Sequence, residues 1–283
     1  MNNVTLQLNN LQVPVKHFTF NGGEEQVVID QAASPKGRVA YVDITAKLKN
    51  SMDVMTLVML TDACRHIHNL DDCARFTLHM PYIPYARQDR VMNAGEAAAV
   101  KAFVNVIAGL KFDKIVVADP HSDVATNLLD NIGARLEVIS QDTLFSEYMG
   151  NTGEIKRNTR ICTVGRGNPV IVAPDAGARK KAQKVADRYG FRIVEAGKVR
   201  DVRDGKITGT SVHDDVTGLP CIIVDDICDG GRTFVPLAAA LKEKGASQVI
   251  LYVTHGIFSN GKQFLLDAGI EQVHAYYDWT ENF

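Results

Sequence analysis

Residues 221–233 read Cys221-Ile222-Ile223-Val224-Asp225-Asp226-Ile227-Cys228-Asp229-Gly230-Gly231-Arg232-Thr233, and they are the most informative stretch of the chain. An apolar run leads into two aspartates and a turn with two glycines, and an apolar helical pattern follows. A near-continuous apolar run of this length is typical of a strand in a parallel sheet that is covered on both faces. The stretch therefore predicts a strand, a turn and a helix, in that order.

Three other runs have the same apolar character. They are Lys114–Asp119, Val170–Asp175 and Val249–His255. Apolar residues at helical spacing predict helices between the strands. These helices are Glu96–Leu110, Arg179–Tyr189, which stops at Gly190, and Phe234–Lys244, which stops at Gly245 and has Thr233 as a candidate N-cap. Repeated strand–helix units predict an α/β fold with an open, mostly parallel sheet and helices on both faces.

The strand–helix pattern occurs twice along the 283 residues. We therefore expect two similar domains, residues 1–145 and residues 146–283. The polar, glycine-containing stretch Gly150–Arg160 is a candidate connection between them. Two domains also agree with a length of about 150 residues for each domain.

The charges of the chain nearly cancel, with 31 basic and 33 acidic residues. This balance argues against a surface that binds a nucleic acid polymer or a membrane by its charge. Five scattered cysteines without a C-x-x-C pair are typical of a protein in a reducing compartment. With no signal-peptide core at the N-terminus and no apolar run of membrane length, we expect a cytoplasmic protein.

Polar residues follow or end the four predicted strands. They are Asp119 and His121, Asp175, Asp225 and Asp226, and Thr254 and His255. A single aspartate after a strand is commonly a turn or cap residue. In open α/β sheets, however, ligands bind at the carboxyl ends of the strands, and four such ends together favour a binding site.

The turn after the two aspartates has the composition of an anion site. Backbone N–H groups of a glycine-rich turn, followed by a helix N-terminus, can bind a phosphate. The carboxylates of Asp225 and Asp226 repel phosphate, but they can accept hydrogen bonds from sugar hydroxyls or hold a cation through water. Together these groups favour a sugar phosphate as the ligand.

This turn resembles the ribose-phosphate binding loop of the type I phosphoribosyltransferases, and further motifs resemble the ribose-phosphate pyrophosphokinase (PRPP synthetase) family in particular. These motifs are Pro81-Tyr82-Ile83-Pro84-Tyr85-Ala86-Arg87-Gln88-Asp89-Arg90, Asp119-Pro120-His121, Pro174-Asp175-Ala176-Gly177 and Thr254-His255-Gly256-Ile257-Phe258-Ser259. The resemblance implies an ATP-dependent diphosphokinase. Such an enzyme transfers the β,γ-diphosphoryl group of ATP to the anomeric hydroxyl of ribose 5-phosphate, giving PRPP and AMP.

The resemblance implies two groups of ATP-binding residues. In the first, Phe20 stacks on the adenine, and Gly22 and Glu24 belong to the same motif. Without the resemblance, these residues favour a glycine turn beside a core phenylalanine. The second group consists of Arg87, Gln88 and His121, whereas the neighbouring Asp89 is a candidate partner for an arginine that holds the loop.

The implied catalytic residues are Lys198 and Arg200, which alternation places on one face of a strand. Asp204–Gly205 has the signature of a tight hairpin turn, so these two residues lie on the first arm of a predicted hairpin. Their positive charges would neutralise charge that develops at the transferred phosphorus. The alternative is a basic arm that is merely solvated.

The resemblance also implies a sugar-phosphate site and a cofactor. The sugar-phosphate site consists of Asp225, Asp226, Asp229, Gly230, Gly231, Arg232 and Thr233. The cofactor is Mg²⁺, with His121 and Asp175 as ligands and Asp119 nearby. Mg²⁺ prefers oxygen ligands, so the histidine rests on the resemblance alone.

Two residues of the loop depart from the family pattern. Gly230 stands where the synthetases have a hydroxyl residue, and Arg232 stands where they have a glycine. Extra room and an added cation suit a 5-phosphate that carries a further group. ADP-ribose as the acceptor, used in rebuilding NAD, is therefore an alternative within the same chemistry.

Two further alternatives belong to other functional classes. One is a phosphoribosyltransferase that shares only the loop, and the other is a non-catalytic regulatory homologue. The family also draws its ATP site from two subunits, so we expect a homo-oligomer that is at least a dimer.

Overall fold

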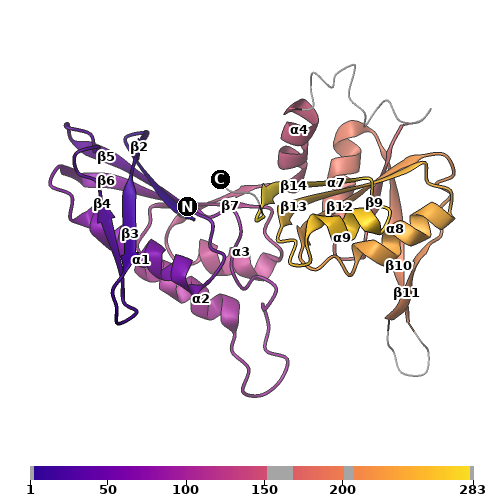
Figure 1. The fold of residues 1–283 in the computed structure, drawn as a ribbon, viewed down its shortest axis with the longest axis horizontal. Coiled ribbons are helices and arrows are strands. Elements are labelled where there is room, and N and C mark those ends of the chain that lie inside the picture. The colour runs from indigo at the N-terminus through magenta and orange to yellow at the C-terminus, as the bar shows by residue number, and fades with distance from the viewer. Residues whose placement is uncertain (1–2, 152–167, 201–206, 281–283) are drawn as a thin grey trace. The chain divides into compact units, whose positions relative to one another are not determined.

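The computed structural model describes residues 3–151, 168–200 and 207–280. The chain divides into two compact units, Met1–Ile139 and Ser140–Phe283 (Figure 1). Each unit is described by itself below. Among the described residues, no helix has the length and apolar character needed to cross a membrane.

The N-terminal unit is a six-stranded sheet with three helices and a separate two-stranded hairpin. Its elements are β1 (Val4–Leu8), β2 (Leu11–Val13), β3 (Val15–Thr19), β4 (Glu25–Ile29), β5 (Val39–Ala46), α1 (Ser51–Arg65), β6 (Leu70–His79), α2 (Ala99–Gly109), β7 (Lys114–Ala118), α3 (Asp123–Asp130) and β8 (Arg135–Ile139). The strand order is β2-β1-β5-β6-β7-β8, and β3 pairs with β4. Strands β5 to β8 are parallel, whereas β1 and β2 pair in antiparallel fashion.

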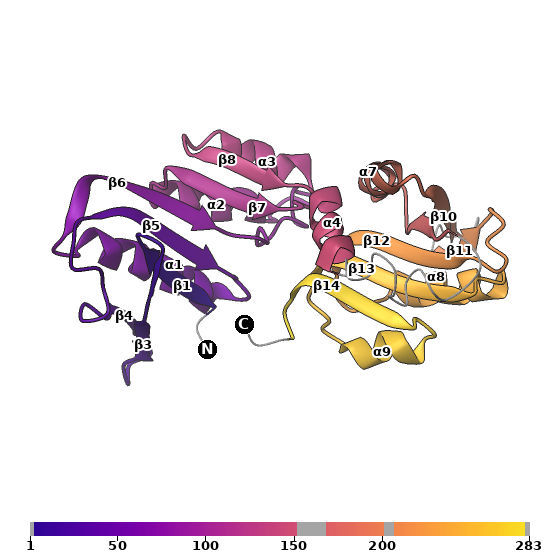
Figure 2. The same cartoon turned by 90° about the horizontal axis from the view of Figure 1, so that it is seen from above.

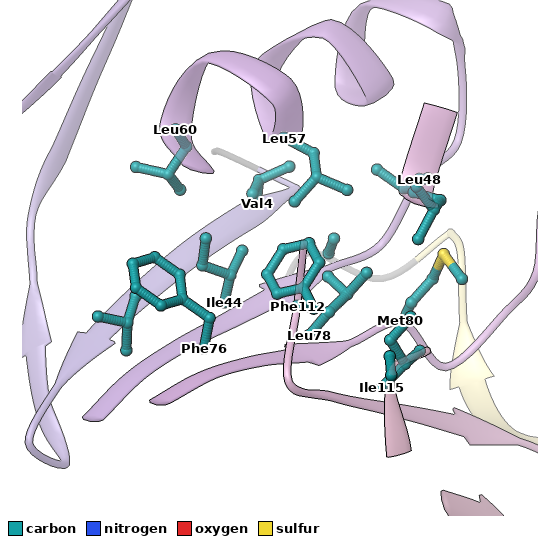
Figure 3. Close-up of a cluster of buried hydrophobic side chains, with 14 of the residues drawn as sticks. Val4, Ile44, Leu48, Leu57, Leu60, Phe76, Leu78, Met80, Phe112 and Ile115 are labelled. Atoms are coloured by element: carbon teal, nitrogen blue, oxygen red, sulfur yellow. The ribbon is translucent and has the colours of Figure 1, made fainter. Parts of the chain in front are cut away.

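One face of this sheet carries the hydrophobic core of the unit. Val42 and Ile44 alternate with the exposed Tyr41 and the half-buried Asp43 along β5, so one face is apolar and the other polar. The buried hydrophobic residues of α1, α2 and α3 all belong to the cluster on the apolar face. Figure 3 shows Leu57 of α1 facing the side chains of this face. In the N-terminal unit the three helices thus cover the same side of the sheet.

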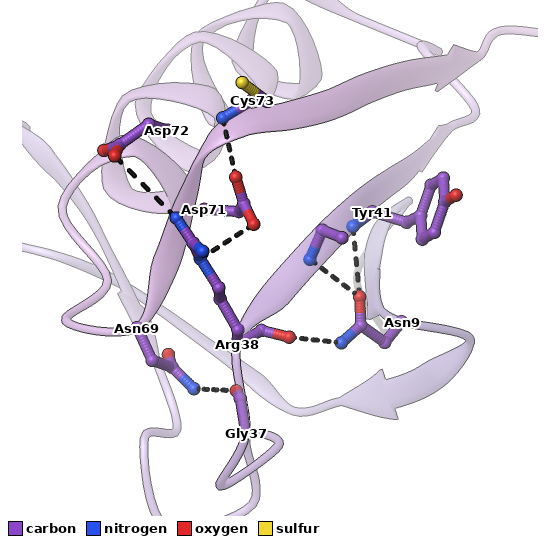
Figure 4. A network of polar contacts seen from close by, with 9 residues as sticks. Asn9, Gly37, Arg38, Tyr41, Asn69, Asp71, Asp72 and Cys73 are labelled. Atoms are coloured by element: carbon purple, nitrogen blue, oxygen red, sulfur yellow. Dashed lines mark hydrogen bonds and ion pairs between the residues drawn. The ribbon is translucent and has the colours of Figure 1, made fainter.

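A polar network joins the starts of β5 and β6 (Figure 4). Arg38 Nε lies 2.7 Å from an Asp71 carboxylate oxygen, and Asn9 Nδ2 donates to the Arg38 carbonyl at 2.9 Å. Asn69 Nδ2 donates to the carbonyl of Gly37 at 2.5 Å. These contacts fix the end of the sheet that is opposite to the carboxyl ends of its parallel strands.

The C-terminal unit has a second six-stranded sheet. Its elements are α4 (Gln141–Asn151), β9 (Val170–Ala173), α7 (Arg179–Tyr189), β10 (Arg192–Arg200), β11 (Ile207–Val212), β12 (Pro220–Cys228), α8 (Phe234–Glu243), β13 (Gln248–Gly256), α9 (Lys262–Asp267) and β14 (Gln272–Asp278). The strand order is β11-β10-β9-β12-β13-β14, and only the β10–β11 pair is antiparallel among these described strands. Figure 2 shows the strands of each sheet side by side.

Both faces of the second sheet are covered. Ile223 of β12 packs in a cluster with residues of α8 and α9, and its neighbours Ile222 and Val224 pack in another with residues of α4 and α7. β9, β12 and β13 are accordingly buried along nearly their whole length, and a continuous apolar run forms the centre of each strand. The predicted α/β fold with mostly parallel sheets is confirmed.

The predicted elements differ from the observed ones mainly at their ends. α7 has the predicted bounds, and Gly190 and Gly245 have the predicted left-handed backbone, with φ of 65° and 82°. α2 starts at Ala99 instead of residue 96, because the Glu96 side chain accepts hydrogen bonds from the N–H groups of Met92 and Asn93 and closes a turn. The predicted N-cap at Thr233 is wrong, because its backbone is helical and its side chain makes no capping hydrogen bond.

Candidate active site

Two adjacent acids lie inside β12, whereas the sequence predicts that they end the strand. The strand continues through Asp225 and Asp226 to Cys228, in register with β13. Successive residues of a strand point to opposite faces, so Asp225 lies on the α8 face and Asp226 on the α7 face. The two carboxylates therefore meet different surroundings although they are neighbours in the chain.

The two acids differ in their electrostatic surroundings. Asp226 forms an ion pair, whereas Asp225 is in an environment that disfavours its negative charge. Lys181 Nζ of α7 lies 3.0 Å from Asp226 Oδ2, and Asp226 is only 7% exposed. The pKa of Asp225 is raised well above its ordinary value, first by desolvation and then by the negative charges of Asp226 and Asp175. A cation or a hydrogen-bond donor beside Asp225 would relieve this unfavourable environment.

Asp175 follows β9 and forms the turn into α7. Its Oδ1 atom accepts hydrogen bonds from the N–H groups of Gly177 and Ala178, at 2.9 and 3.1 Å. Asp175 thus has the structural role of a turn residue. Since β9 is the parallel neighbour of β12, Asp175 also lies at the same edge as the acid pair.

The glycine turn after β12 is shaped by its second glycine. Gly231 has φ of 78°, and a Cβ atom there would lie 2.7 Å from Leu265 Cδ2. Both the backbone conformation and the space require glycine at this position. The exposed side chain of Arg232 and the half-buried hydroxyl of Thr233 follow in the turn, and neither has a hydrogen-bond partner among the described residues. Together with Asp229 and Gly230 they form the loop that the sequence predicts.

A neighbouring loop supports the glycine turn. The N–H groups of Ile257 and Phe258 both donate to the carbonyl of Cys228, at 2.8 and 3.1 Å. Phe258 has a positive φ of 49°, which is unusual for a phenylalanine, and its ring fills the space where Gly256 has no side chain. Strained backbone of this kind is concentrated at functional sites.

The predicted catalytic residues lie on β10. Lys198 pairs with Thr210 and Arg200 with Ile207 of β11, so the two arms of the predicted hairpin exist. The described part of the structure includes the backbone of Lys198 and Arg200 but not their side chains. The predicted turn at Asp204–Gly205 lies outside the described residues.

In the N-terminal unit, three predicted ATP-binding residues line one cleft. The cleft has a volume of about 670 Å³ and is lined by Arg87, Gln88, Asp89, Arg90, Met92, Glu96, Ala97 and His121. It lies where the chain leaves β6 and β7, which is the carboxyl edge of the parallel strands. The cleft brings His121 together with Arg87 and Gln88, although His121 is more than thirty residues further along the chain.

Asp89 interacts with two positively chargeable side chains of this cleft, Arg90 and His121. Its carboxylate lies 3.2 Å from Arg90 Nε, which agrees with the predicted pairing to an arginine. Desolvation alone would raise the pKa of Asp89, but the hydrogen bond and charge of Arg90, together with nearby His121, hold it below its ordinary value. Asp119 is buried beside this edge with φ of 41°, and its N–H donates to the carbonyl of Ile139 at 2.8 Å.

The predicted adenine motif forms the tip of the β3–β4 hairpin. The N–H of Phe20 donates to the carbonyl of Glu24 at 2.7 Å, and Gly23 has φ of 90°. Phe20 is 52% exposed, and Gly22 and Glu24 are exposed as well. The alternative of a core phenylalanine is therefore wrong.

The described residues contain no group of three or more histidine, cysteine or acidic side chains arranged to hold a metal ion. Mg²⁺ does not need such a group, because it is usually bound by one or two carboxylates together with waters and substrate phosphates. Asp175 and the raised pKa of Asp225 in the C-terminal unit are compatible with a cation of this kind.

Sequence reasoning missed two residues that contact the predicted site. Lys181 pairs with Asp226, and Asn260 Nδ2 donates to the carbonyl of Gly230 at 2.9 Å. The sequence contains a signal for Lys181, because Arg179, Lys180 and Lys181 place three cations at a helix N-terminus, where positive charge is unfavourable. We find no comparable signal for Asn260, whose contact joins residues thirty positions apart.

Both units match domains of known protein families. Residues 1–110 match the N-terminal domain of ribose phosphate pyrophosphokinase, and residues 141–279 match the phosphoribosyl transferase domain. A ribose-phosphate pyrophosphokinase of Hyphomonas neptunium is 31% identical over 241 residues, which are 85% of this chain and 71% of that protein. The chain belongs to the ribose-phosphate pyrophosphokinase family. The family member of Campylobacter jejuni is also 31% identical, over 87% of this chain and 72% of its own length.

A solved structure of this family agrees with the fold. The crystal structure of phosphoribosylpyrophosphate synthetase from Mycobacterium smegmatis covers 95% of this chain and 81% of its own chain, with a TM-score of 0.73 and 26% identity. The similarity extends over both units, so the chain as a whole has the fold of this synthetase. The chain is therefore not similar to phosphoribosyltransferases through its loop alone.

Proposed function

We propose that this protein transfers the β,γ-diphosphoryl group of ATP to the anomeric hydroxyl of ribose 5-phosphate, giving PRPP and AMP. One observation carries the proposal. A chain of the ribose-phosphate pyrophosphokinase family places the acid pair Asp225–Asp226 and the Gly230–Gly231 turn at one sheet edge. Acids for sugar hydroxyls and amides for a phosphate are the groups that ribose 5-phosphate needs.

The sugar phosphate binds to the turn after β12 in this proposal. The backbone amides of Gly230 and its neighbours, the hydroxyl of Thr233 and the guanidinium of Arg232 are donors for the 5-phosphate. Asp225 and Asp226 accept hydrogen bonds from the ribose hydroxyls, and Asp229 completes the loop. The exposure of Arg232 supports this role, because its charge is not used in another described ion pair.

ATP binds to residues of the N-terminal unit in this proposal. Arg87 and Gln88 hold the nucleotide together with His121, and the shared cleft supports their grouping. Arg87 gives a charge-assisted hydrogen bond to a phosphate. Phe20 stacks on the adenine, Glu24 accepts from its amino group, and Gly22 belongs to the turn between them.

The transfer itself needs alignment and positive charge more than covalent help from the protein. The anomeric oxygen forms a bond to the β-phosphorus, the bond from this phosphorus to the oxygen bridging the α- and β-phosphates breaks, and AMP leaves. The hydroxyl proton passes to solvent. Lys198 and Arg200 neutralise the charge that develops on the transferred group.

Mg²⁺ is the proposed cofactor. Asp175 is its proposed ligand in the C-terminal unit, and Asp119 and His121 are the proposed ligands in the N-terminal unit. The turn that holds Asp175 supports the assignment, because the carboxylate has a fixed direction before any ligand binds. When bound, the ion supplies positive charge to the phosphate oxygens.

The protein is also proposed to act as a homo-oligomer, at least a dimer. The exposure of Phe20 at a hairpin tip supports this, because an aromatic ring that stacks on adenine needs a binding site around it. In the described part of its own unit, Phe20 is in ring contact only with Phe18, at a centroid distance of 5.2 Å.

Release of AMP tests the proposed function. Purified protein is incubated with ATP and MgCl₂, with ribose 5-phosphate or with ADP-ribose, and AMP is measured by chromatography. We expect AMP that depends on ribose 5-phosphate, since the relatives are ribose-phosphate enzymes and do not favour ADP-ribose. If AMP forms with ADP-ribose but not with ribose 5-phosphate, the acceptor is ADP-ribose. If no AMP forms with either sugar, the proposed diphosphokinase activity is refuted.

Two further assays separate the other functional classes. Consumption of PRPP with a nucleobase, in the absence of ATP, would indicate a phosphoribosyltransferase. Unchanged turnover in the Lys198→Ala variant would remove the catalytic role of β10.

A further inference from the structure

The carbonyl of Gly230 is held by a side chain from outside its own loop. Asn260, which lies between β13 and α9, donates from Nδ2 to the Gly230 oxygen at 2.9 Å. The two loops are also joined at Cys228, whose carbonyl accepts from two N–H groups of the Asn260 loop. The turn after β12 is thus supported by a second loop as well as by its own residues.

Asn260 and Gly230 fit each other in size. A Cβ atom on Gly230 would lie 3.1 Å from Asn260 Nδ2 and 3.5 Å from Ser259 Oγ. The asparagine amide therefore packs directly on the face of Gly230 that has no side chain. Gly230 has no need of glycine for its φ angle, since the positive φ belongs to Gly231. The close approach of Asn260 explains why a small residue stands at position 230.

The hydrogen bond to Gly230 has a consequence for the next amide. A peptide group is planar, so fixing the carbonyl of Gly230 also fixes the direction of the N–H of Gly231. Both residues are glycines, so the orientation of their peptide depends on its contacts. The Gly231 N–H is directed toward the Cys228 sulfur on one side, and Asn260 holds the Gly230 carbonyl on the other.

We infer that Asn260 is a positioning residue of the sugar-phosphate turn, which holds the Gly230–Gly231 peptide and with it the course of the turn that receives the 5-phosphate of the sugar. The inference rests on the proposed function of the turn. Asn260 itself acts through Gly230. No other described group accepts a hydrogen bond from its amide, so this contact accounts for its polar side chain.

The main test is the steady-state kinetics of Asn260→Ala and Asn260→Asp in the full-length protein. Aspartate has the shape of asparagine but donates no hydrogen bond when ionised. We expect both variants to raise the KM for ribose 5-phosphate about five- to tenfold, the effect of one ordinary hydrogen bond. The KM for ATP and the melting temperature should stay close to the wild-type values.

Gln263→Ala is the matched control. Gln263 is an exposed amide three residues further on, and its side chain donates to Asp267 at 2.7 Å, so this variant should keep wild-type kinetics. If Asn260→Asp keeps the wild-type KM, the side chain acts by its volume and the inference is wrong. Equal rises in the KM of both substrates would overturn it as well.

A measurement without turnover separates this inference from the proposed function. In protein labelled with ¹⁵N-glycine, the Gly231 amide is assigned by its loss in Gly231→Ala. Asn260→Ala should shift this signal in the absence of any ligand, and Gln263→Ala should not. If the wild type forms no AMP, the proposed function fails, whereas an unmoved Gly231 signal would refute the positioning role alone.

Discussion

Lys181 Nζ lies 3.0 Å from Asp226 Oδ2, and this ion pair connects the first turns of α7 to the acid pair of β12. Asp226 is nearly buried, so its negative charge is balanced inside the protein by a side chain from α7. Asp225, on the opposite face of the strand, has no such cation in the described structure. The two acids of one motif therefore have different surroundings, because Lys181 balances the charge of Asp226 and no described side chain balances that of Asp225.

The Lys181→Met variant is expected to lose stability. Methionine keeps most of the apolar stem but leaves the Asp226 carboxylate buried without its cation, which costs about 3 kcal/mol. Urea unfolding followed by circular dichroism measures this change. Lys184→Met, on an exposed position of the same helix, is the control and should unfold like the wild type.

The double variant Lys181→Met with Asp226→Asn distinguishes the ion pair from simple packing. Removal of both charges should recover much of the stability that Lys181→Met loses, because position 226 then no longer carries a buried charge without its cation. Additive losses in the double variant would contradict the role of the pair. Lys181→Arg should keep most of the wild-type stability.

Lys198→Ala and Arg200→Ala are each expected to lower kcat by about 10²–10³-fold, because each would remove positive charge from the transferred phosphoryl group. The KM values should change much less than kcat. Initial rates of AMP formation at saturating substrates give this comparison. Lys180→Ala, an exposed cation at the start of α7, serves as the control, and equal rates in all three variants would remove the arm from the mechanism.

Gly231→Ala is expected to disrupt the sugar-phosphate turn. The new methyl group meets Leu265 at 2.7 Å and the residue must keep φ of 78°, so both a clash and backbone strain arise. We expect a loss of about 2 kcal/mol in unfolding free energy and a raised KM for ribose 5-phosphate.

Gly218→Ala separates the two causes. Gly218 has a similar φ of 71°, but nothing lies within 4 Å of a Cβ atom there. It should show the strain alone, with about 1 kcal/mol of lost stability and normal kinetics. If Gly231→Ala resembles Gly218→Ala in both measurements, contact with Leu265 is unimportant.

His274 is expected to make stability depend on pH. Desolvation, followed by the charge of Lys262, lowers the pKa of this half-buried histidine on β14, which lies against Tyr148 and Gln272. Below about pH 6.5 the unfolded chain then binds more protons than the folded one, so stability falls as the pH falls from 6.5 toward the folded pKa. The slope is at most about 1.4 kcal/mol per pH unit.

Unfolding in urea at pH 7.5 and pH 5.5 tests this expectation. The loss between the two pH values should be smaller in His274→Gln than in the wild type. His66→Gln, at an exposed position after α1, should leave the loss unchanged. An identical loss in wild type and His274→Gln would assign the pH dependence to other groups.

The central strands and α7 of the C-terminal unit could be predicted because their patterns are strong. β9, β12 and β13 are buried on both faces, and a continuous apolar run indicates this directly. β1 and β5 are half-buried with polar residues on alternate positions, and they went unpredicted. The ends of elements were less accurate, since the extension of β12 through two aspartates depends on pairing with β13 and not on local preference.

The site could be predicted as far as its motifs reach along the chain. The acids, the glycine turn and Arg87–Gln88 lie in contiguous stretches, and the turn and the shared cleft are present in the structure. Lys181 and Asn260 are separate in sequence from what they touch, so only the fold reveals their contacts. The capping role of Thr233 failed because the turn before α8 is already helical at this residue.

The turn that holds Asp175 has a further consequence for ligand binding. Two backbone N–H groups fix its carboxylate in one rotamer in the protein without ligand. Ordering a side chain costs conformational entropy, up to about 2 kcal/mol for the most flexible side chains. This cost has already been met during folding, so a ligand that binds Asp175 gains the full strength of the contact. Preorganisation of this residue would appear in calorimetry as binding with a small entropic penalty.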